Sequence, residues 1–80
     1  MRAQIKISLK KDVLDPQGRA IKKALHQLGF SEISEVRQGK YFEVDIDDSL
    51  ELMASKVVER MCQQLLANPV VETYSYELVD

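Results

Sequence analysis

Apolar and polar residues alternate over residues 2–10, with the apolar side chains on one side of the chain. A period of two is typical of a strand with one buried face. A similar alternation recurs over residues 41–47 and 70–79, and a shorter extended region covers residues 33–37. We therefore expect four strands.

A period near 3.6 indicates an amphipathic helix after the first strand. Its start is well defined, because Asp15 is a preferred N-cap residue and Pro16 suits the first helical position. Gly29 is expected to close the helix at its C-terminal end. The apolar stripe of this helix comprises Ala20, Ile21, Ala24, Leu25 and Leu28.

Gly18 does not fit this helix, since a first-turn glycine costs roughly 0.5–1 kcal/mol relative to alanine. It is either tolerated there or marks a close approach by another backbone, a side chain or a ligand. The residues alone leave these two interpretations equally open. If the position marks a close contact, Gly18→Ala should leave the isolated fold as stable or more stable, while weakening assembly.

A second amphipathic helix follows residues 47–49, which supply caps, and Asp48 and Glu51 are spaced as in a capping box. The helix should stop at residues 67–69, because Pro69 cannot continue it. Its buried stripe is predicted to comprise Leu50, Ala54, Val57, Val58, Met61, Cys62 and Leu65.

The order of these elements predicts an α+β fold of the ferredoxin-like, split βαβ kind (β-α-β-β-α-β). Right-handed crossovers would place both helices on one face of a four-stranded antiparallel sheet. A hairpin loop of Gln38, Gly39 and Lys40, with Gly39 in the left-handed conformation, would join the two middle strands. That register sets Glu35 opposite Glu43, so a bulge or an early strand end is expected there.

The length of 80 residues indicates one domain, residues 1–80, close to the lower limit for a self-sufficient core. Oligomerisation or a partner is therefore expected. A net charge of −2 argues against nucleic acid as the main partner. No membrane-spanning run or secretory signal is recognisable, and the single Cys62 suits a reducing compartment, so we expect a cytoplasmic location.

The search for catalytic residues finds no constellation. The only nucleophile and base of the usual kind are Cys62, predicted on a buried stripe, and His26, predicted on a polar face. We do not expect them to act together. RNA binding through the sheet is disfavoured too, because the predicted central strands offer only Tyr41 for base stacking.

Two charged groups leave binding alternatives open. Glu43, Asp45, Asp47 and Asp48 could hold a hard cation, but strand alternation and helix capping explain most of them, so no metal is expected. At the predicted hairpin tip, the group of Arg37, Lys40 and Tyr41 could recognise an anion or a carboxylate of a partner, or be solvated.

Four segments of the chain resemble one known family. They are Val13-Leu14-Asp15-Pro16-Gln17-Gly18, Leu25-x-x-Leu28-Gly29-Phe30, Val36-Arg37-x-Gly39-Lys40-Tyr41 and Cys62-x-x-Leu65-Leu66-Ala67-Asn68-Pro69-Val70-Val71-Glu72. In type and order they are similar to those of the PurS family, the small subunit of phosphoribosylformylglycinamidine (FGAM) synthase. The resemblance covers essentially the whole chain.

The resemblance implies a non-catalytic subunit of a complex in purine biosynthesis that converts formylglycinamide ribonucleotide to its amidine. A glutaminase subunit would release ammonia and a large synthetase subunit would use it, with ATP, Mg²⁺ and glutamine bound by these partners and no cofactor by this chain. This chain would bridge the two, assist assembly and ammonia transfer, and form a homodimer or higher homo-oligomer. Its candidate contact residues are Asp15, Pro16, Gly18, Arg37, Gly39, Lys40, Tyr41, Asn68 and Pro69. The resemblance also favours a close contact at Gly18, so residues 15–18 are interpreted as a docking surface.

Two alternatives stay open. A regulatory module that senses a small molecule at an oligomer interface predicts a ligand-dependent rise in the melting temperature of this protein alone. An independent hydrolase predicts residual activity that is lost on changing Cys62 or His26.

Overall fold

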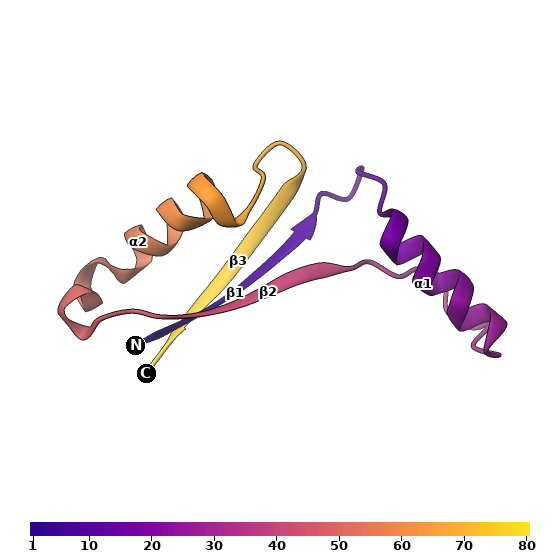
Figure 1. The fold of residues 1–80 in the computed structure, drawn as a ribbon, viewed down its shortest axis with the longest axis horizontal. Coiled ribbons are helices and arrows are strands. Elements are labelled where there is room, and N and C mark those ends of the chain that lie inside the picture. Colours follow the sequence, from indigo (N-terminus) through magenta and orange to yellow (C-terminus); the bar gives the residue numbers. More distant parts are fainter.

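The computed structural model describes residues 1–80 and contains a three-stranded sheet, two α-helices and two short helical segments of other types (Figure 1). In chain order the elements are β1 (Arg2–Leu9), α1 (Pro16–Gln27), β2 (Gly39–Asp45), the 3₁₀-helical η1 (Asp48–Met53), α2 (Ala54–Met61), the π-helical η2 (Cys62–Leu66) and β3 (Glu72–Val79). The sheet order is β2-β1-β3, and both pairs are antiparallel. The predicted α+β class is confirmed.

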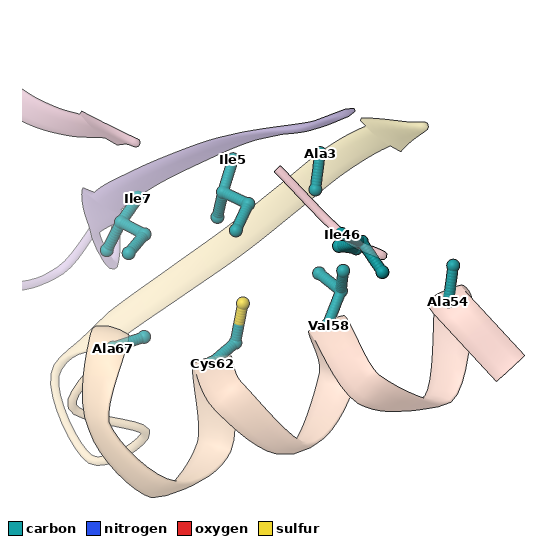
Figure 2. Close-up of a cluster of buried hydrophobic side chains, with 8 residues drawn as sticks. All are labelled: Ala3, Ile5, Ile7, Ile46, Ala54, Val58, Cys62 and Ala67. Carbon is teal, nitrogen blue, oxygen red and sulfur yellow. The ribbon is translucent and has the colours of Figure 1, made fainter. Parts of the chain in front are cut away.

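The core lies between one face of this sheet and α2. Ile5 of β1 pairs with Phe42 on one side and Tyr76 on the other, so the inward residues of the three strands share one face. The fully buried Ile5, Ile7 and Val58 each contribute about 1.5–3 kcal/mol by leaving water. Figure 2 shows the whole cluster: Ala3, Ile5, Ile7, Ile46, Ala54, Val58, Cys62 and Ala67.

The second helical region covers the predicted residues but is not one uniform helix. Asp47 caps η1 by accepting from the Ser49 N–H at 3.0 Å, in place of the capping box predicted for Asp48. Of the predicted stripe, Ala54, Val58 and Cys62 are buried, at the i, i+4 and i+8 spacing. Leu50 and Leu65 are exposed, so the buried stripe is narrower than predicted.

The predicted strand over residues 33–37 and its hairpin are wrong. These residues form no strand, and β2 begins at Gly39, where it pairs with β1 instead. Gly39 does not have a positive φ; it is close to β1, and a Cβ atom there would lie 2.4 Å from the Ile7 carbonyl oxygen. The positive φ belongs to Gly29, at 102°, which closes α1 as predicted.

The predicted packing of both helices on one face of a four-stranded sheet is also wrong. Only α2 covers the sheet, whereas α1 projects away from the end of β1 (Figure 1). No residue of α1 belongs to the buried core, and the molecule measures 51 × 27 × 14 Å. We call residues 10–38 the arm, and the sheet with η1, α2 and η2 the body. No helix of either part has the length and apolar character needed to cross a membrane.

Candidate functional site

The base of the arm is held by the side chain of Asp15. Its carboxylate accepts one hydrogen bond from the Gly18 N–H at 2.9 Å and another from the Gln38 N–H at 2.7 Å. Asp15 is the one charged residue in the buried set, at 5% exposure. The bonds from Gln38 and Gly18 hold the pKa of Asp15 below its ordinary value, because they favour the ionised carboxylate. Asp15 therefore caps α1, as predicted, and also binds the segment that enters β2.

Arg37 also bonds the base of the arm, through the chain that leaves β1. Its guanidinium donates to the carbonyl oxygens of Lys10 at 2.8 Å, Val13 at 3.1 Å and Leu9 at 3.4 Å. A planar guanidinium with several fixed donors suits such a set of acceptors. Arg37 thus ties the chain that leaves β1 to the chain that enters β2.

Gly18 lies beside these bonds, where it leaves no room for a side chain. A Cβ atom on Gly18 would lie 2.2 Å from the Val36 carbonyl oxygen and 2.8 Å from Oδ2 of Asp15. The expected close approach exists, but it is made by the backbone of the same chain. We call Asp15, Gly18, Val36, Arg37 and Gln38 the junction.

Beyond the junction, α1 bonds only to residues 28–38, which lead back to β2 and which we call the returning segment. The Phe30 N–H bonds to the Leu25 carbonyl at 2.9 Å, and Nε2 of His26 lies 2.7 Å from the Ile33 carbonyl oxygen. The arm also exposes large apolar side chains. They are Leu14 at 72%, Ile21 at 40%, Leu28 at 75% and Phe30 at 47%. We call this set the apolar arm surface.

The predicted contact residues do not form one surface. A groove of about 310 Å³ brings Asp15, Pro16, Gly39 and Lys40 together at the base of the arm. Its remaining lining residues are Ile7, Ser8, Leu9, Gln17, Gln38 and Glu72. Tyr41 stands apart, half exposed on the outer face of the sheet over a second pocket.

Glu72, which the sequence did not single out, connects this groove to the turn before β3. Its carboxylate accepts from the Asn68 N–H at 2.7 Å and pairs with Nζ of Lys40 at 3.3 Å. Asn68 and Pro69 are themselves exposed. A glutamate in a strand carries no sequence signal that it will bond to a turn and a lysine. Ile21 and Leu28 of the apolar arm surface, in contrast, are marked by their helical spacing.

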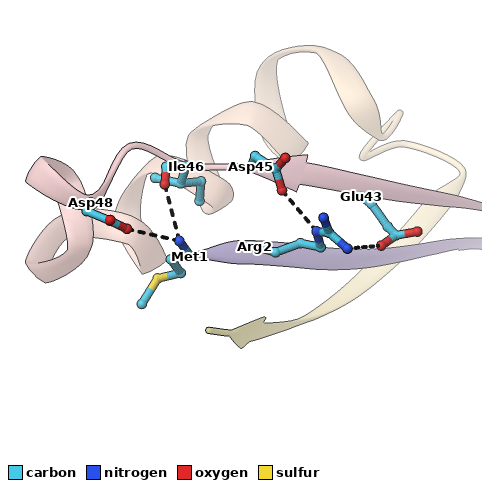
Figure 3. Close-up of polar contacts among 6 residues, drawn as sticks. All are labelled: Met1, Arg2, Glu43, Asp45, Ile46 and Asp48. Atoms are coloured by element: carbon cyan, nitrogen blue, oxygen red, sulfur yellow. Dashed lines mark hydrogen bonds and ion pairs between the residues drawn. The ribbon is translucent and has the colours of Figure 1, made fainter.

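The residues considered for catalysis or metal binding are buried or make contacts within the fold. Cys62 lies in the core, where burial raises the pKa of its thiol, and His26 lies on the arm. Arg2 pairs with Asp45 at 2.9 Å and with Glu43 at 3.1 Å (Figure 3). The Met1 amino group pairs with Asp48 at 3.1 Å, and Asp47 caps η1. No group of three or more His, Cys, Asp or Glu side chains is placed to hold a metal ion.

Comparison with known proteins decides the family. The family model described as PurS, phosphoribosylformylglycinamidine (FGAM) synthase, matches residues 2–80. The chain belongs to the PurS family. The resemblance carried by the four sequence segments is thereby confirmed.

Individual PurS proteins match over nearly the whole chain. The PurS subunit of phosphoribosylformylglycinamidine synthase from Bacillus subtilis is 44% identical over 96% of this chain and 90% of its own length. The corresponding subunit from Methanocaldococcus jannaschii is 40% identical over 96% of this chain and 93% of its own length.

Solved PurS structures share the fold. Bacillus subtilis PurS superimposes with a TM-score of 0.86 at 43% identity, over 99% of this chain and 98% of that one. A chain in a structure of PurLQS from Thermotoga maritima gives a TM-score of 0.75 at 27% identity, over 95% and 93% of the two chains. The projecting arm is part of a fold that matches these structures over almost all of its residues.

Proposed function

We propose that this chain is the small subunit of an FGAM synthase complex in purine biosynthesis and assembles with a glutaminase subunit and a large synthetase subunit. The observation that carries the proposal is the match to a chain of the Thermotoga maritima PurLQS structure over 95% of this chain. Membership of the PurS family over residues 2–80 supports it.

Within this complex the chain acts by binding, not by chemistry of its own. It bridges the two partners and assists assembly and ammonia transfer, while ATP, Mg²⁺ and glutamine bind to the partners. Cys62 is buried, and the carboxylates of Glu43 and Asp45 pair with Arg2. Both observations support a binding role for this chain. A cytoplasmic location goes with the same role.

A second copy of this chain is the further partner that the surface suits best. The apolar arm surface has no cover within the chain, and the body exposes Leu50, Leu52 and Met53 on η1. The arm has six basic and four acidic residues, whereas the rest of the chain has five basic and nine acidic ones. Opposite charge therefore attracts the arm of one copy to the body of another, and apolar contact holds it there.

The test is reconstitution with the two partner subunits. The full chain is mixed with the glutaminase and the large synthetase, with glutamine and nucleotides present, and the mass of the eluted species is measured by light scattering. We expect one complex containing all three proteins, and glutamine-dependent FGAM formation only when this chain is included. Separate elution under every condition would reject the proposal.

A further inference from the structure

The direction of the arm is set at its base alone. No side chain of α1 enters the core, and α1 lies clear of the sheet and of α2 in Figure 1. The arm is joined to the body by two chain segments, one leaving β1 and one entering β2. Without bonds between these segments, α1 would swing on two flexible connections.

The junction supplies those bonds. Arg37, on the returning segment, donates to three carbonyl oxygens of residues 9–15, which we call the outgoing segment, at 2.8 to 3.4 Å. Asp15, on the outgoing segment, accepts the Gln38 N–H of the returning one at 2.7 Å. The two side chains therefore cross-link the segments in both directions. Hydrogen bonds to charged groups are stronger than those between neutral groups.

The geometry of the arm makes these bonds consequential. A helix of 12 residues is about 18 Å long at its usual rise, so a swing of about 20° at the base moves its far end by about 6 Å. A displacement of that size exceeds the range of apolar contact. Leu28 and Phe30 lie at the far end of α1 and depend most on the angle at the base.

We propose that Asp15 and Arg37 form a clasp that fixes the direction of α1, and that assembly requires both residues through this orientation instead of through contact with a partner. The clasp is a property of this chain alone. Its effect on assembly rests on the proposed function.

The first experiment measures hydrogen exchange of the full chain, residue by residue. Arg37→Met keeps much of the side-chain volume and removes all its donors. Arg60→Met is the matched control, because it makes the same change at an exposed residue of α2 whose side chain makes no bond in the structure. We expect amides in the arm to exchange about tenfold faster in Arg37→Met, with β1, α2 and β3 unchanged. Arg60→Met should match the wild type, and unchanged arm exchange in Arg37→Met would overturn the clasp.

A second variant and an assembly measurement complete the test. Asp15→Asn replaces one carboxylate oxygen by a donor, so it should loosen the arm in the same way, even if Arg37→Met does not fold. Both variants should reduce the amount of assembled complex, and Arg60→Met should not. Reduced assembly with normal arm exchange would mean that Arg37 contacts a partner directly, which overturns the proposal. Failure of the wild type to assemble would reject the proposed function, while the exchange data would still decide on the clasp.

Discussion

Gly18 lies in the first turn of α1, directly beside the backbone of Val36. A first-turn glycine in an otherwise well-formed helix predicts a close approach, and the Val36 carbonyl makes it. Nothing in the local sequence says that the approaching group belongs to the same chain, because Val36 is 18 residues away, beyond the end of α1. An internal contact therefore explains Gly18, which is buried together with Asp15, while docking of a partner at residues 15–18 stays a prediction.

The predicted effect of Gly18→Ala on the isolated fold changes sign as a result. The added Cβ atom meets a backbone oxygen at 2.2 Å, which cannot yield cheaply. Overpacking of this kind costs about 1–3 kcal/mol, more than the helix propensity that alanine gains. We expect a lower midpoint of urea unfolding. Ala24→Gly, at an exposed position of α1, is the control and should lose only about 0.5–1 kcal/mol. A more stable Gly18→Ala protein would refute the internal contact.

Asp15 makes the stability of the junction depend on acid. Its pKa is lowered in the folded protein, so its contribution is present above the unfolded pKa near 3.8 and is lost as the pH falls through the lower folded value. Asp47 and Glu72, whose pKa values are also lowered by backbone hydrogen bonds, add to the same acid limb. We expect the urea midpoint of Asp15→Asn to fall less between neutral pH and about pH 3 than that of the wild type. An equal fall of the urea midpoint in both proteins would show that the Asp15 bonds are absent in solution.

At the scale of single elements, the hydrophobic pattern predicted the helices and the long strands well. The inward faces of β1 and β3, the start of α1 and the extent of the second helical region all agree with their periodicity. The exception is the region 33–37, whose short apolar alternation was read as a strand. Ile33 and Val36 are half-buried, but beside α1 instead of in a sheet. The unfavourable pairing of Glu35 with Glu43 is a sequence signal against that strand, and so is the placing of Ile33 away from the core in the same register.

Glu59 connects α2 to the edge strand β3. Its carboxylate accepts hydrogen bonds from the hydroxyls of Tyr74 and Tyr76, and Ser55 lies 3.2 Å from the Tyr76 hydroxyl. The bond to Glu59 raises the pKa of Tyr74, because it favours the protonated phenol beside a carboxylate. These tyrosines therefore both pack on the core and bond to the helix that covers it.

Alkaline titration should report this connection. A raised folded pKa stabilises the protein below the unfolded pKa near 10.0, and that stability is lost as the pH rises through the folded pKa. In Glu59→Gln we expect the pKa of Tyr74 to move down toward its ordinary value, measured by the ultraviolet absorbance of tyrosinate. Glu77→Gln, at an exposed position with no bond in the structure, should leave the titration unchanged. An unchanged curve in Glu59→Gln would contradict the bond.

At the scale of the whole molecule, the error in the predicted fold has one physical origin. An apolar stripe shows that a helix face will be covered, but it does not show which chain covers it. The stripe of α1 was assigned to the core of its own domain, whereas Ile21 and Leu28 are exposed in the single chain. Of the candidate site, the sequence indicated Asp15, Gly18 and Arg37 individually. Their contacts with Gln38 and Val36 depend on the folded path of the chain and could not be predicted.

A test of the apolar arm surface follows from its exposure. Ile21→Asp and Leu28→Asp should leave the unfolding free energy of the single chain within about 0.5 kcal/mol, because these positions are not packed in it. They should lower the mass measured by sedimentation velocity, since a charge would be buried between two copies. Ser75→Asp, on the polar outer face of the sheet, is the control. Unchanged mass in both arm variants would exclude this surface from the proposed homo-oligomer.

The π-helical η2 has a consequence for how the length of this chain can vary. The Ala67 N–H bonds to the Cys62 carbonyl, five residues back, at 2.9 Å, whereas an α-helical turn would bond four residues back. The turn therefore holds one residue more than an ordinary turn needs. Deleting one of the exposed residues Gln63 and Gln64 would let a regular turn close while leaving β3 in register. We therefore expect the end of η2 to accept a single-residue deletion, whereas a deletion within a paired strand would shift its register.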